Sequence, residues 1–493
     1  MNYYMGIDNG GTLCKAVLFD SAGKYICSAS EELVMLTPDA GHTERDMEEL
    51  WQANCRIVRK VAEGSGIDPK DIKGAACSGH GKGLYLWGKN GKPAMNGIVS
   101  TDSRAWEYPE RWARDGTVDK VFEKTYQKIL ACQPVSLLCW IRDNKPEVFS
   151  NIMEVFEVKD YIRFRLTGNA NAELTDISGS NLLNLKTRQY DKELLSLYGL
   201  DSIWEFLPPL KGSFDVCGRI TSETAKLTGL TEDTVIAGGM FDIDACAIAM
   251  DITNDENIAV IAGTWSINEY ISKRPVLNKS VMMNSLYCME GYYLVEECSP
   301  TSAGNLKWFM EMFMPDVKSY REFDKLSESV APDGQNLIFL PYVFGSNYNP
   351  QAKATLLGLD SHHTKNHIAR AILEGVCFCH KVHIEKLLQN RKTTKAIRLA
   401  GGAAKSSLWT QLFADILELP IELVEGDELG ALGCAMAAAV AAGEYSDIEN
   451  AAKSMVKIKT RVAPNPKTFE AYRKKYKLYQ DVSDRLDSYW KKI

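Results

Sequence analysis

The residues from Asp8 to Lys15 have the types and spacing needed to hold a phosphate group beside a metal ion. Gly10 and Gly11 leave main-chain N–H groups open to an anion, because no Cβ stands in the way. Thr12 and Lys15 can add a hydroxyl and a cation to the same phosphate. Asp8 ends an apolar stretch, where a carboxylate can reach a hydrated Mg²⁺ that the phosphate shares. Taken alone, however, an Asn-Gly turn is more typical of an ordinary surface hairpin.

A second copy of this pattern favours the chemical interpretation. Residues 257–271 again predict a strand, a tight turn at Gly263 and Thr264, and a second strand. Corresponding strands and helices follow both copies, at 75–79 and 235–250 in the first half and at 397–402 and 421–442 in the second. A repeat with a period of half the chain predicts two similar units that offer one Gly/Thr hairpin each. Such a pair suits a clamp around a polyphosphate.

A nucleotide-binding turn is predicted between a strand and a helix, at Gly401, Gly402, Ala403 and Ser406. This layout brings main-chain N–H groups and a helix N-terminus beside an anion. The glycines are also typical of a simple left-handed turn, and Ser406 has a rival role as a helix N-cap.

Asp242 is the candidate catalytic base. It follows Gly238–Phe241, where a strand is expected to end and a helix to begin. A carboxylate there could accept the proton of an attacking hydroxyl, although Asp244 competes for the role and either residue could be an N-cap. An unperturbed Asp has a pKa near ~4 and is a weak base at neutral pH. Phosphoryl transfer tolerates a weak base, because positioning dominates that reaction.

His80 and Lys82 lie in the Gly-rich turn 78–83, at the end of a predicted strand. This position is poor for core packing and good for contacting a ligand, although Lys82 could also be a solvated surface lysine. The other polar cluster is His363 and His367, with Cys377, Cys379 and His380 nearby. Ligands carried by one helix, with two thiols on different faces, argue against a structural zinc ion there.

The elements that must position these residues follow from local signals. Residues 25–34 predict a third strand, and Asp46 with Glu49 predicts a capped helix start. Helices are also expected at 302–313 and 365–388. A tyrosine-rich helix at 468–493 is expected to pack its Tyr/Leu stripe against the domain.

The 493 residues fit two domains of about 245 residues each. We place the division at 1–250 and 251–493, with residues from about 105 to 230 as an insertion. The net charge of −7 disfavours a nucleic-acid partner. No signal peptide or membrane span is apparent, and thirteen scattered cysteines are typical of reduced, cytoplasmic proteins.

Taken together, these motifs resemble the FGGY carbohydrate kinase family over nearly the whole chain. Residues 8–15 are similar to its first phosphate motif, Gly263 and Thr264 to its second, and Asp242 to its catalytic aspartate. The adenosine-site signature is similar to 401–415 and 430–433, and other family-like segments are 339–342 and 371–375. The resemblance implies two actin-like, ribonuclease H-like α/β domains. Each would hold a five-stranded mixed sheet flanked by helices, with the active-site cleft between them.

Within the family the chain is most similar to the L-xylulose kinase branch, through residues 41–46, 81–84, 241–242 and 299–305. It departs from the wider pattern at three positions. Gly11 replaces a usual Thr, Lys82 stands where D-xylulose kinases carry a His, and Ser100 occupies a position where many members place a Trp over the sugar. The departure at Gly11 barely affects the predicted ATP-binding role, because Thr12 can supply the hydroxyl. The departures at Lys82 and Ser100 affect which sugar is expected to bind.

The resemblance implies an ATP- and Mg²⁺-dependent kinase for a primary hydroxyl of an open-chain ketose, with L-xylulose as the leading candidate. Gly304 joins the nucleotide-binding residues, and the sugar is expected near His80, Lys82, Asp102 and Asp242, mostly on the first domain. Rival hypotheses are a kinase for D-xylulose, ribulose, erythritol or glycerol, and an actin- or chaperone-like ATPase without an acceptor. A homodimer is a family-level expectation.

Overall fold

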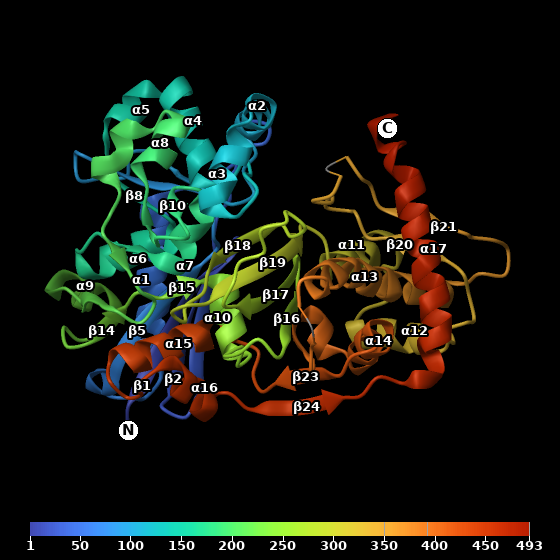
Figure 1. The fold of residues 1–493 in the computed structure, drawn as a ribbon. Helices are drawn as coiled ribbons and strands as arrows, with labels where there is room; N and C mark the ends of the chain where they lie inside the picture. The colour runs from blue at the N-terminus through green and yellow to red at the C-terminus, as the bar shows by residue number, and fades with distance from the viewer. Residues whose placement is uncertain (350, 392, 493) are drawn as a thin grey trace.

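The computed structural model describes residues 1–349, 351–391 and 393–492. Two bodies lie side by side, and each is built on a mixed β-sheet packed against helices (Figure 1). The first sheet has five central strands in the order β14-β5-β1-β2-β3, with β1 parallel to β5 and antiparallel to β2. These strands are β1 (Tyr3–Asn9), β2 (Leu13–Asp20), β3 (Tyr25–Glu32), β5 (Ile72–Gly79) and β14 (Val235–Ala237).

The second sheet repeats this arrangement in the order β23-β22-β16-β17-β19. Its central strand β16 is parallel to β22 and antiparallel to β17, as β1 is to β5 and β2. The strands are β16 (Ile258–Ala262), β17 (Ser266–Ser272), β19 (Tyr293–Ser299), β22 (Ile397–Gly401) and β23 (Ile421–Val424). The internal repeat predicted from the two hairpins is therefore confirmed.

Each sheet has seven strands, two more than the predicted five-stranded core. The added strands are β13 (Val216–Arg219) and β15 (Met240–Phe241) in the first sheet, and β18 (Met283–Leu286) and β24 (Ile458–Val462) in the second. Strand β15 has only two residues, and β24 is mostly exposed. Such strands carry little alternating hydrophobic pattern, so the sequence gives no strong signal for them.

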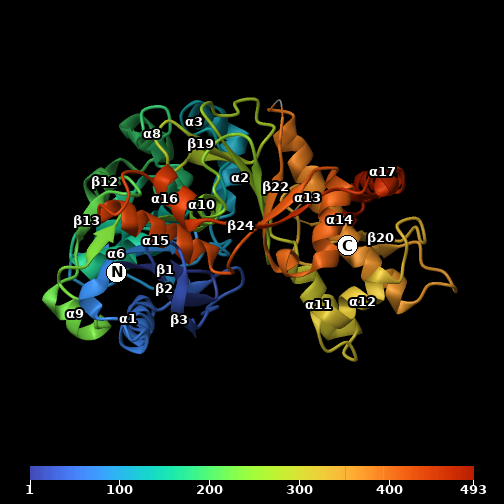
Figure 2. The ribbon, with the colours of Figure 1, turned by 90° about the horizontal axis from the view of Figure 1, so that it is seen from below.

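Helix α15 (Leu429–Ala441) comes from the second half of the chain but packs on strands β1 and β5 of the first sheet. In Figure 1 and Figure 2 it lies with α16 (Ile448–Met455) beside β1 and β2. The approach is so close that a Cβ on Gly6 would lie 1.9 Å from the carbonyl oxygen of Ala431. Helix α15 also packs against α10 (Asp242–Ala249), so the ends of the two repeats meet between the sheets.

The remaining helices surround the two sheets. Helix α1 (Met47–Gly64) covers β2 and β3, and Asp46 caps it by accepting the Glu49 N–H at 2.8 Å, as predicted. Residues 105–230 hold α2 (Glu107–Asp115), α3 (Thr117–Thr125), α4 (Pro134–Asn144), α5 (Pro146–Ser150), α6 (Val158–Thr167), α7 (Leu174–Ile177), α8 (Lys192–Tyr198) and α9 (Ser222–Thr228). The second body holds α11 (Gly304–Phe313), α12 (Tyr320–Glu328), α13 (Lys365–Leu388), α14 (Ser407–Leu417) and α17 (Phe469–Asp487).

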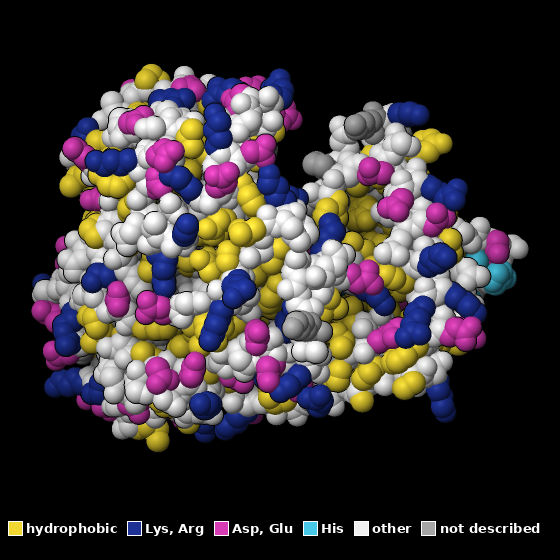
Figure 3. All heavy atoms as spheres, in the orientation of Figure 1, with side chains coloured by type: hydrophobic (Ala, Val, Ile, Leu, Met, Phe, Trp, Pro, Cys, Tyr) yellow, Lys and Arg dark blue, Asp and Glu magenta, His cyan; other side chains and the backbone are white. Residues whose placement is uncertain are grey.

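The tyrosine stripe of α17 is buried against the second body, as predicted, through Tyr472, Tyr476 and Tyr479. Figure 3 shows a notch between the two bodies, and acidic and basic side chains interspersed over this face. Among the described helices, none combines the length and apolar character needed to cross a bilayer.

Candidate active site

Asp8 lies at the end of β1, beside the N-terminus of α15. Its Oδ1 accepts a hydrogen bond from the Ser78 hydroxyl at 2.8 Å, and its Oδ2 would lie 3.3 Å from a Cβ on Gly430. Burial raises the pKa of Asp8, although the Ser78 hydroxyl and the Lys15 ammonium lower it, and Glu428 raises it further. In the described part of the chain no cation forms an ion pair with this carboxylate. The site therefore favours an added cation.

Arg45 holds the first hairpin turn through hydrogen bonds to its main chain. The sequence reasoning did not select this residue as functional. Its guanidinium is buried and donates to the carbonyl oxygens of Gly10, at 3.4 Å, and Gly11, at 2.5 Å. Arg45 lies in the 41–46 segment that resembles the L-xylulose kinase branch, which is the signal that could have identified it. Lys15 forms an ion pair with Glu428 at 2.7 Å, and both side chains are about a quarter exposed. An exposed pair of this kind is weak, about 0–1 kcal/mol, so a phosphate can compete for Lys15.

The second hairpin meets the other predicted nucleotide residues. A Cβ on Gly304 would lie 3.7 Å from the Cα of Thr264, and one on Gly402 would lie 3.7 Å from the Ala303 Cβ. Gly401 has a φ of +86°, and a Cβ there would come within 2.6 Å of the Ala262 carbonyl oxygen. A cavity of about 740 Å³ opens beside Gly401, at the ends of β22 and β23. The structure thus brings together the turn at Gly263 and Thr264, Gly304, and the pair Gly401 and Gly402.

The two other nucleotide-site candidates have local structural roles. Ser406 caps α14 by accepting the Trp409 N–H at 3.0 Å, which is the alternative noted from the sequence. Ala403 is fully buried in the short 3₁₀ turn before that helix. The predicted helix therefore begins at Ser407, several residues after the glycines.

His380 on α13 supports the second hairpin, and the sequence reasoning considered it only as a zinc ligand. Its Nε2 lies 2.7 Å from the Ser302 hydroxyl, and its Nδ1 lies 3.0 Å from the Ser266 hydroxyl. Burial lowers the pKa of His380 to about 3, and His383 lowers it too, so the ring is neutral. The neutral imidazole joins the start of β17 to the segment before Gly304.

The other histidines are not gathered with the cysteines. His363 Nδ1 accepts the Asp360 N–H and His367 Nδ1 accepts the Thr364 N–H, both at 3.1 Å. The only candidate metal cluster among the described residues is Asp360, His362 and His363, at the surface before α13. Within this cluster His363 Nδ1 already accepts a main-chain N–H, and His362 Nδ1 pairs with the Asp360 carboxylate.

Asp242 is the first residue of α10, and its side chain does not cap the helix. Its Oδ1 is buried and has no hydrogen-bond partner among the described residues. Burial raises the pKa of Asp242 well above the usual value, Asp8 and Asp176 raise it further, and Lys82 lowers it. The charges of both Asp8 and Lys82 therefore act on Asp242. Asp244 is fully buried, with both oxygens unpartnered in the described structure.

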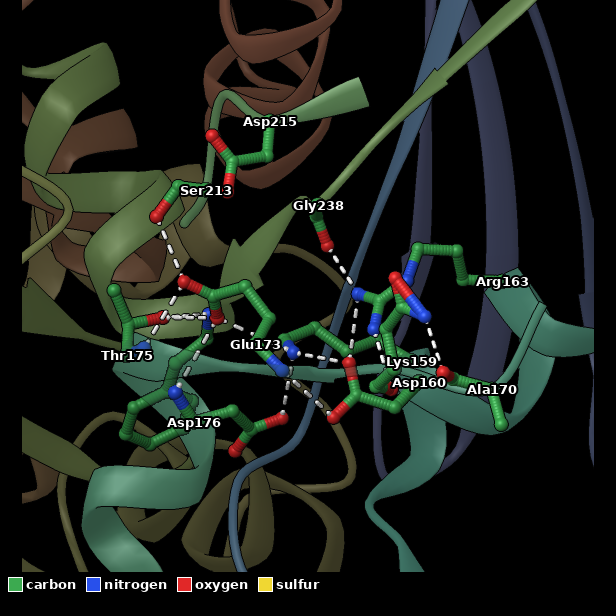
Figure 4. A network of polar contacts seen from close by, with 12 residues as sticks. Lys159, Asp160, Arg163, Ala170, Glu173, Thr175, Asp176, Ser213, Asp215 and Gly238 are labelled. Carbon is green, nitrogen blue, oxygen red and sulfur yellow. Dashed lines mark hydrogen bonds and ion pairs between the residues drawn. The ribbon is translucent and has the colours of Figure 1, made fainter. Parts of the chain in front are cut away.

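The loop before Asp242 is held by a buried polar network, which Figure 4 shows. Arg163 donates to the Gly238 carbonyl, the Gly239 N–H donates to the Ser213 carbonyl at 3.0 Å, and the Phe241 N–H donates to the Thr175 hydroxyl at 2.9 Å. Three main-chain contacts in four residues fix where α10 begins, and thus where Asp242 lies.

Glu173 is the centre of this network. Its carboxylate accepts hydrogen bonds from the hydroxyls of Ser213 and Thr175, each at 2.7 Å, and lies 3.3 Å from the Lys159 ammonium. Lys159 also pairs with Asp160 at 2.7 Å, and all these side chains are buried. Removing one partner from such a network leaves an uncompensated buried charge, which is strongly destabilising. The network escaped prediction, because its charges are spaced like those of ordinary solvated helices.

The predicted sugar residues His80 and Lys82 follow the end of β5, where Gly79 pairs with Phe241, the residue before Asp242. His80 is buried, and its Nε2 lies 3.1 Å from the Tyr85 hydroxyl. Burial lowers the pKa of His80 to about 3, helped by Arg45, so this ring is also neutral. Lys82 has a left-handed φ of 66°, and its Nζ lies 5.3 Å from the centre of the Phe241 ring.

Lys82 is a partly buried cation rather than a freely solvated one. Burial lowers its pKa, but Glu296 first, and also Asp242, raise it, so the net pKa lies above the usual value. Asp102 is occupied by protein donors: Arg104 binds it at 2.8–3.0 Å and the Thr43 N–H at 2.7 Å. Asp102 therefore links the segments that carry Thr43 and Arg104, and its carboxylate oxygens already have partners within the protein.

Comparisons with known proteins match this geometry. Residues 3–249 match the N-terminal domain of the FGGY family of carbohydrate kinases, and residues 258–442 match its C-terminal domain. A probable L-xylulose kinase of Pasteurella multocida is 36% identical, over 99% of both chains. An L-xylulose/3-keto-L-gulonate kinase of Escherichia coli is 35% identical, over 100% of this chain and 98% of that protein. The crystal structure of a xylulose kinase from Lactobacillus acidophilus superposes with a TM-score of 0.92, at 27% identity over 100% of both chains. The chain therefore belongs to the FGGY family of carbohydrate kinases, and it is a sugar kinase.

Proposed function

We propose that the protein transfers the γ-phosphoryl group of ATP to a primary hydroxyl of open-chain L-xylulose, giving L-xylulose 5-phosphate. The observation that carries the proposal is the buried, unpartnered Oδ1 of Asp242 at the start of α10, on which the charges of Asp8 and Lys82 both act. A carboxylate in that position can meet a hydroxyl that lies between a phosphate clamp and a sugar pocket. The names of the similar kinases support L-xylulose as the acceptor.

In this mechanism Asp242 orients the sugar hydroxyl and accepts its proton. The hydroxyl oxygen forms a bond to the γ-phosphorus while the bond to the β,γ-bridging oxygen breaks, so ADP leaves. The raised pKa makes Asp242 a stronger base than a solvated Asp, and the Lys82 cation favours the ionised form that can accept a proton. The transition state is loose, so the positioning by the 238–241 loop contributes much of the effect.

Asp8 would hold Mg²⁺. Its carboxylate offers the oxygen donors that a hard cation prefers, and Gly430 leaves space beside Oδ2. When bound, Mg²⁺ neutralises charge on the β- and γ-phosphates. The protein residues that would grip those phosphates are Gly10, Gly11, Thr12, Lys15, Gly263 and Thr264, with the nucleotide at Gly304, Gly401 and Gly402.

The division into a sugar side at 1–250 and a nucleotide side at 251–493 belongs to the same proposal. Closure of the cleft between the two sheets would exclude water, which otherwise consumes ATP without an acceptor. The reduced state of all thirteen cysteines supports action in the cytoplasm.

A sugar panel tests the proposal. Purified protein with Mg-ATP should release ADP much faster with L-xylulose than without sugar, and faster than with D-xylulose, ribulose, erythritol, glycerol or a keto sugar acid. Detection of a 5-phosphate by mass spectrometry and NMR identifies the product. Equal ADP release with every sugar and with none would instead support an actin-like ATPase that has no acceptor.

A further inference from the structure

Buried polar atoms without partners gather where the two sheets face each other. Within the described structure they include Oδ1 of Asp242 and both oxygens of Asp244 from the first half, and both oxygens of Glu269 and Oε2 of Glu296 from the second. Glu269 is 0% exposed and Glu296 is 1% exposed. Buried polar groups almost always have hydrogen-bond partners, so a cluster of exceptions needs a cause. A ligand with several hydroxyl groups is such a cause.

Glu296 and Glu269 lie directly opposite each other on β19 and β17. Side chains alternate along a strand, so Glu297 points to the other face, where His383 binds it at 3.0 Å. Cys298, two residues along β19, shares the face of Glu296. The edge of this sheet contacts the first body: Met283 of β18 lies opposite Glu296, and β18 packs on α7, which in turn contacts β15 just before Asp242.

The charges of Lys82 and Glu296 interact across the two bodies. Glu296 is the carboxylate that raises the pKa of Lys82 most, yet no ion pair joins Lys82 to any carboxylate in the described ranges. A lysine ammonium only donates hydrogen bonds, whereas a carboxylate only accepts them. The Lys82 ammonium can therefore donate to a hydroxyl or carbonyl oxygen of a sugar, and the Glu296 carboxylate can accept from a hydroxyl of the same sugar.

We propose that Glu296 accepts hydrogen bonds from the sugar hydroxyls, with Glu269 opposite it on the neighbouring strand, so that the ketose is held between Lys82 of the first body and Glu296 of the second. This inference rests on the proposed kinase function and adds a binding wall from the second half of the chain. Sequence reasoning placed the sugar mostly on the first domain, with no residue beyond Asp242. A sugar that bridges the two bodies also favours the closed arrangement in which phosphoryl transfer excludes water.

The test is the variant Glu296→Gln, which keeps the size of the side chain but removes its charge. We expect KM for L-xylulose to rise about 10- to 150-fold, the range for loss of a charged hydrogen bond, while KM for ATP changes less than about twofold. Glu297→Gln is the matched control. It removes a buried carboxylate from the same strand but the opposite face, so it should leave KM for L-xylulose unchanged.

The outcomes separate this inference from the proposed function. An active wild-type enzyme whose KM for L-xylulose is the same in Glu296→Gln would overturn the inference and leave the kinase function standing. A wild-type enzyme with no ketose-dependent ADP release would overturn both. If Glu296→Gln does not fold, Glu269→Gln takes the same measurement, and an unchanged KM there also counts against the binding wall. A purely structural role would lower Tm without the selective change in KM for the sugar.

Discussion

Thr175→Val should separate positioning of the base from stability. The Thr175 hydroxyl accepts the Phe241 N–H at 2.9 Å and donates to Glu173 at 2.7 Å, and it is fully buried. Valine has nearly the same shape but neither hydrogen bond. Phe241 immediately precedes Asp242, so the loss acts on the residue that sets the position of the base.

The magnitude follows from the two lost bonds. An unsatisfied buried N–H costs about 1–3 kcal/mol, and the bond to the charged Glu173 contributes about 1.5–3 kcal/mol. Together these losses predict a fall in Tm of about 5–24 °C, at roughly 2–4 °C per kcal/mol for a domain of this size. If the loop shifts by about 1 Å, kcat should fall about 10²-fold, because transfer requires close alignment.

The assay is ADP release at saturating ATP and sugar, with Tm measured on the same samples. Thr175→Ser restores the hydroxyl and should recover most of kcat. Thr228→Val is the matched control, since the Thr228 hydroxyl is buried and donates at 2.8 Å to the Thr224 carbonyl on α9, away from the loop. Equal kcat in Thr175→Val and Thr228→Val, at similar Tm, would refute the positioning role.

Three further outcomes are expected. Asp242→Asn should lower kcat about 10²- to 10⁴-fold with ATP binding retained, whereas Asp244→Asn should be mild, and reversed effects would reassign the base. Lys82→Met should shift the acid limb of the kcat pH–rate profile to higher pH. Lys82 lowers the pKa of Asp242, so removing the lysine charge leaves the Asp242 carboxyl protonated over a wider pH range. Gly430→Ala should raise the Mg²⁺ concentration for half-maximal activity about 10- to 100-fold without changing KM for the sugar, because the new Cβ lies 3.3 Å from Asp8 Oδ2; an unchanged Mg²⁺ requirement would place the metal elsewhere.

The parts of the fold that sequence reasoning predicted are those set by local chemistry. The turns after Asp8 and Ala262 lie between short apolar strands, so both hairpins could be predicted from the sequence. Their repetition predicted two similar domains. The cap at Asp46 and the start of α10 at Asp242 follow from residue types within one helical turn. These features need no knowledge of distant contacts.

The features that escaped prediction depend on distant contacts. Lys159 and Glu173 are typical surface residues by type, and only the tertiary fold shows that both are fully buried. Glu296 and Glu297 are adjacent acids in one strand, and the sequence does not tell which faces the sugar. The strand pairing separates them, because Glu297 binds His383 on one face of the sheet while Glu296 lies on the other face, opposite Glu269. Long-range pairing therefore fixes the substrate side of the site.

The placement of α15 also constrains how the cleft can open. The loop 425–428 leaves the second sheet after β23 and brings Glu428 to Lys15 and Gly430 to Asp8, so the second half of the chain completes the metal end of the first sheet. Helix α15 is tightly packed on β1, with no space for a Cβ on Gly6, so it must stay with the first sheet. Opening cannot then be a simple separation of residues 1–250 from 251–493. The chain must bend at 251–257, at 425–428 and between α16 and β24, where it passes from one body to the other. Motion at these links moves the Thr264 hairpin and Glu296 relative to Asp8 and Asp242, while the metal end of the site stays intact.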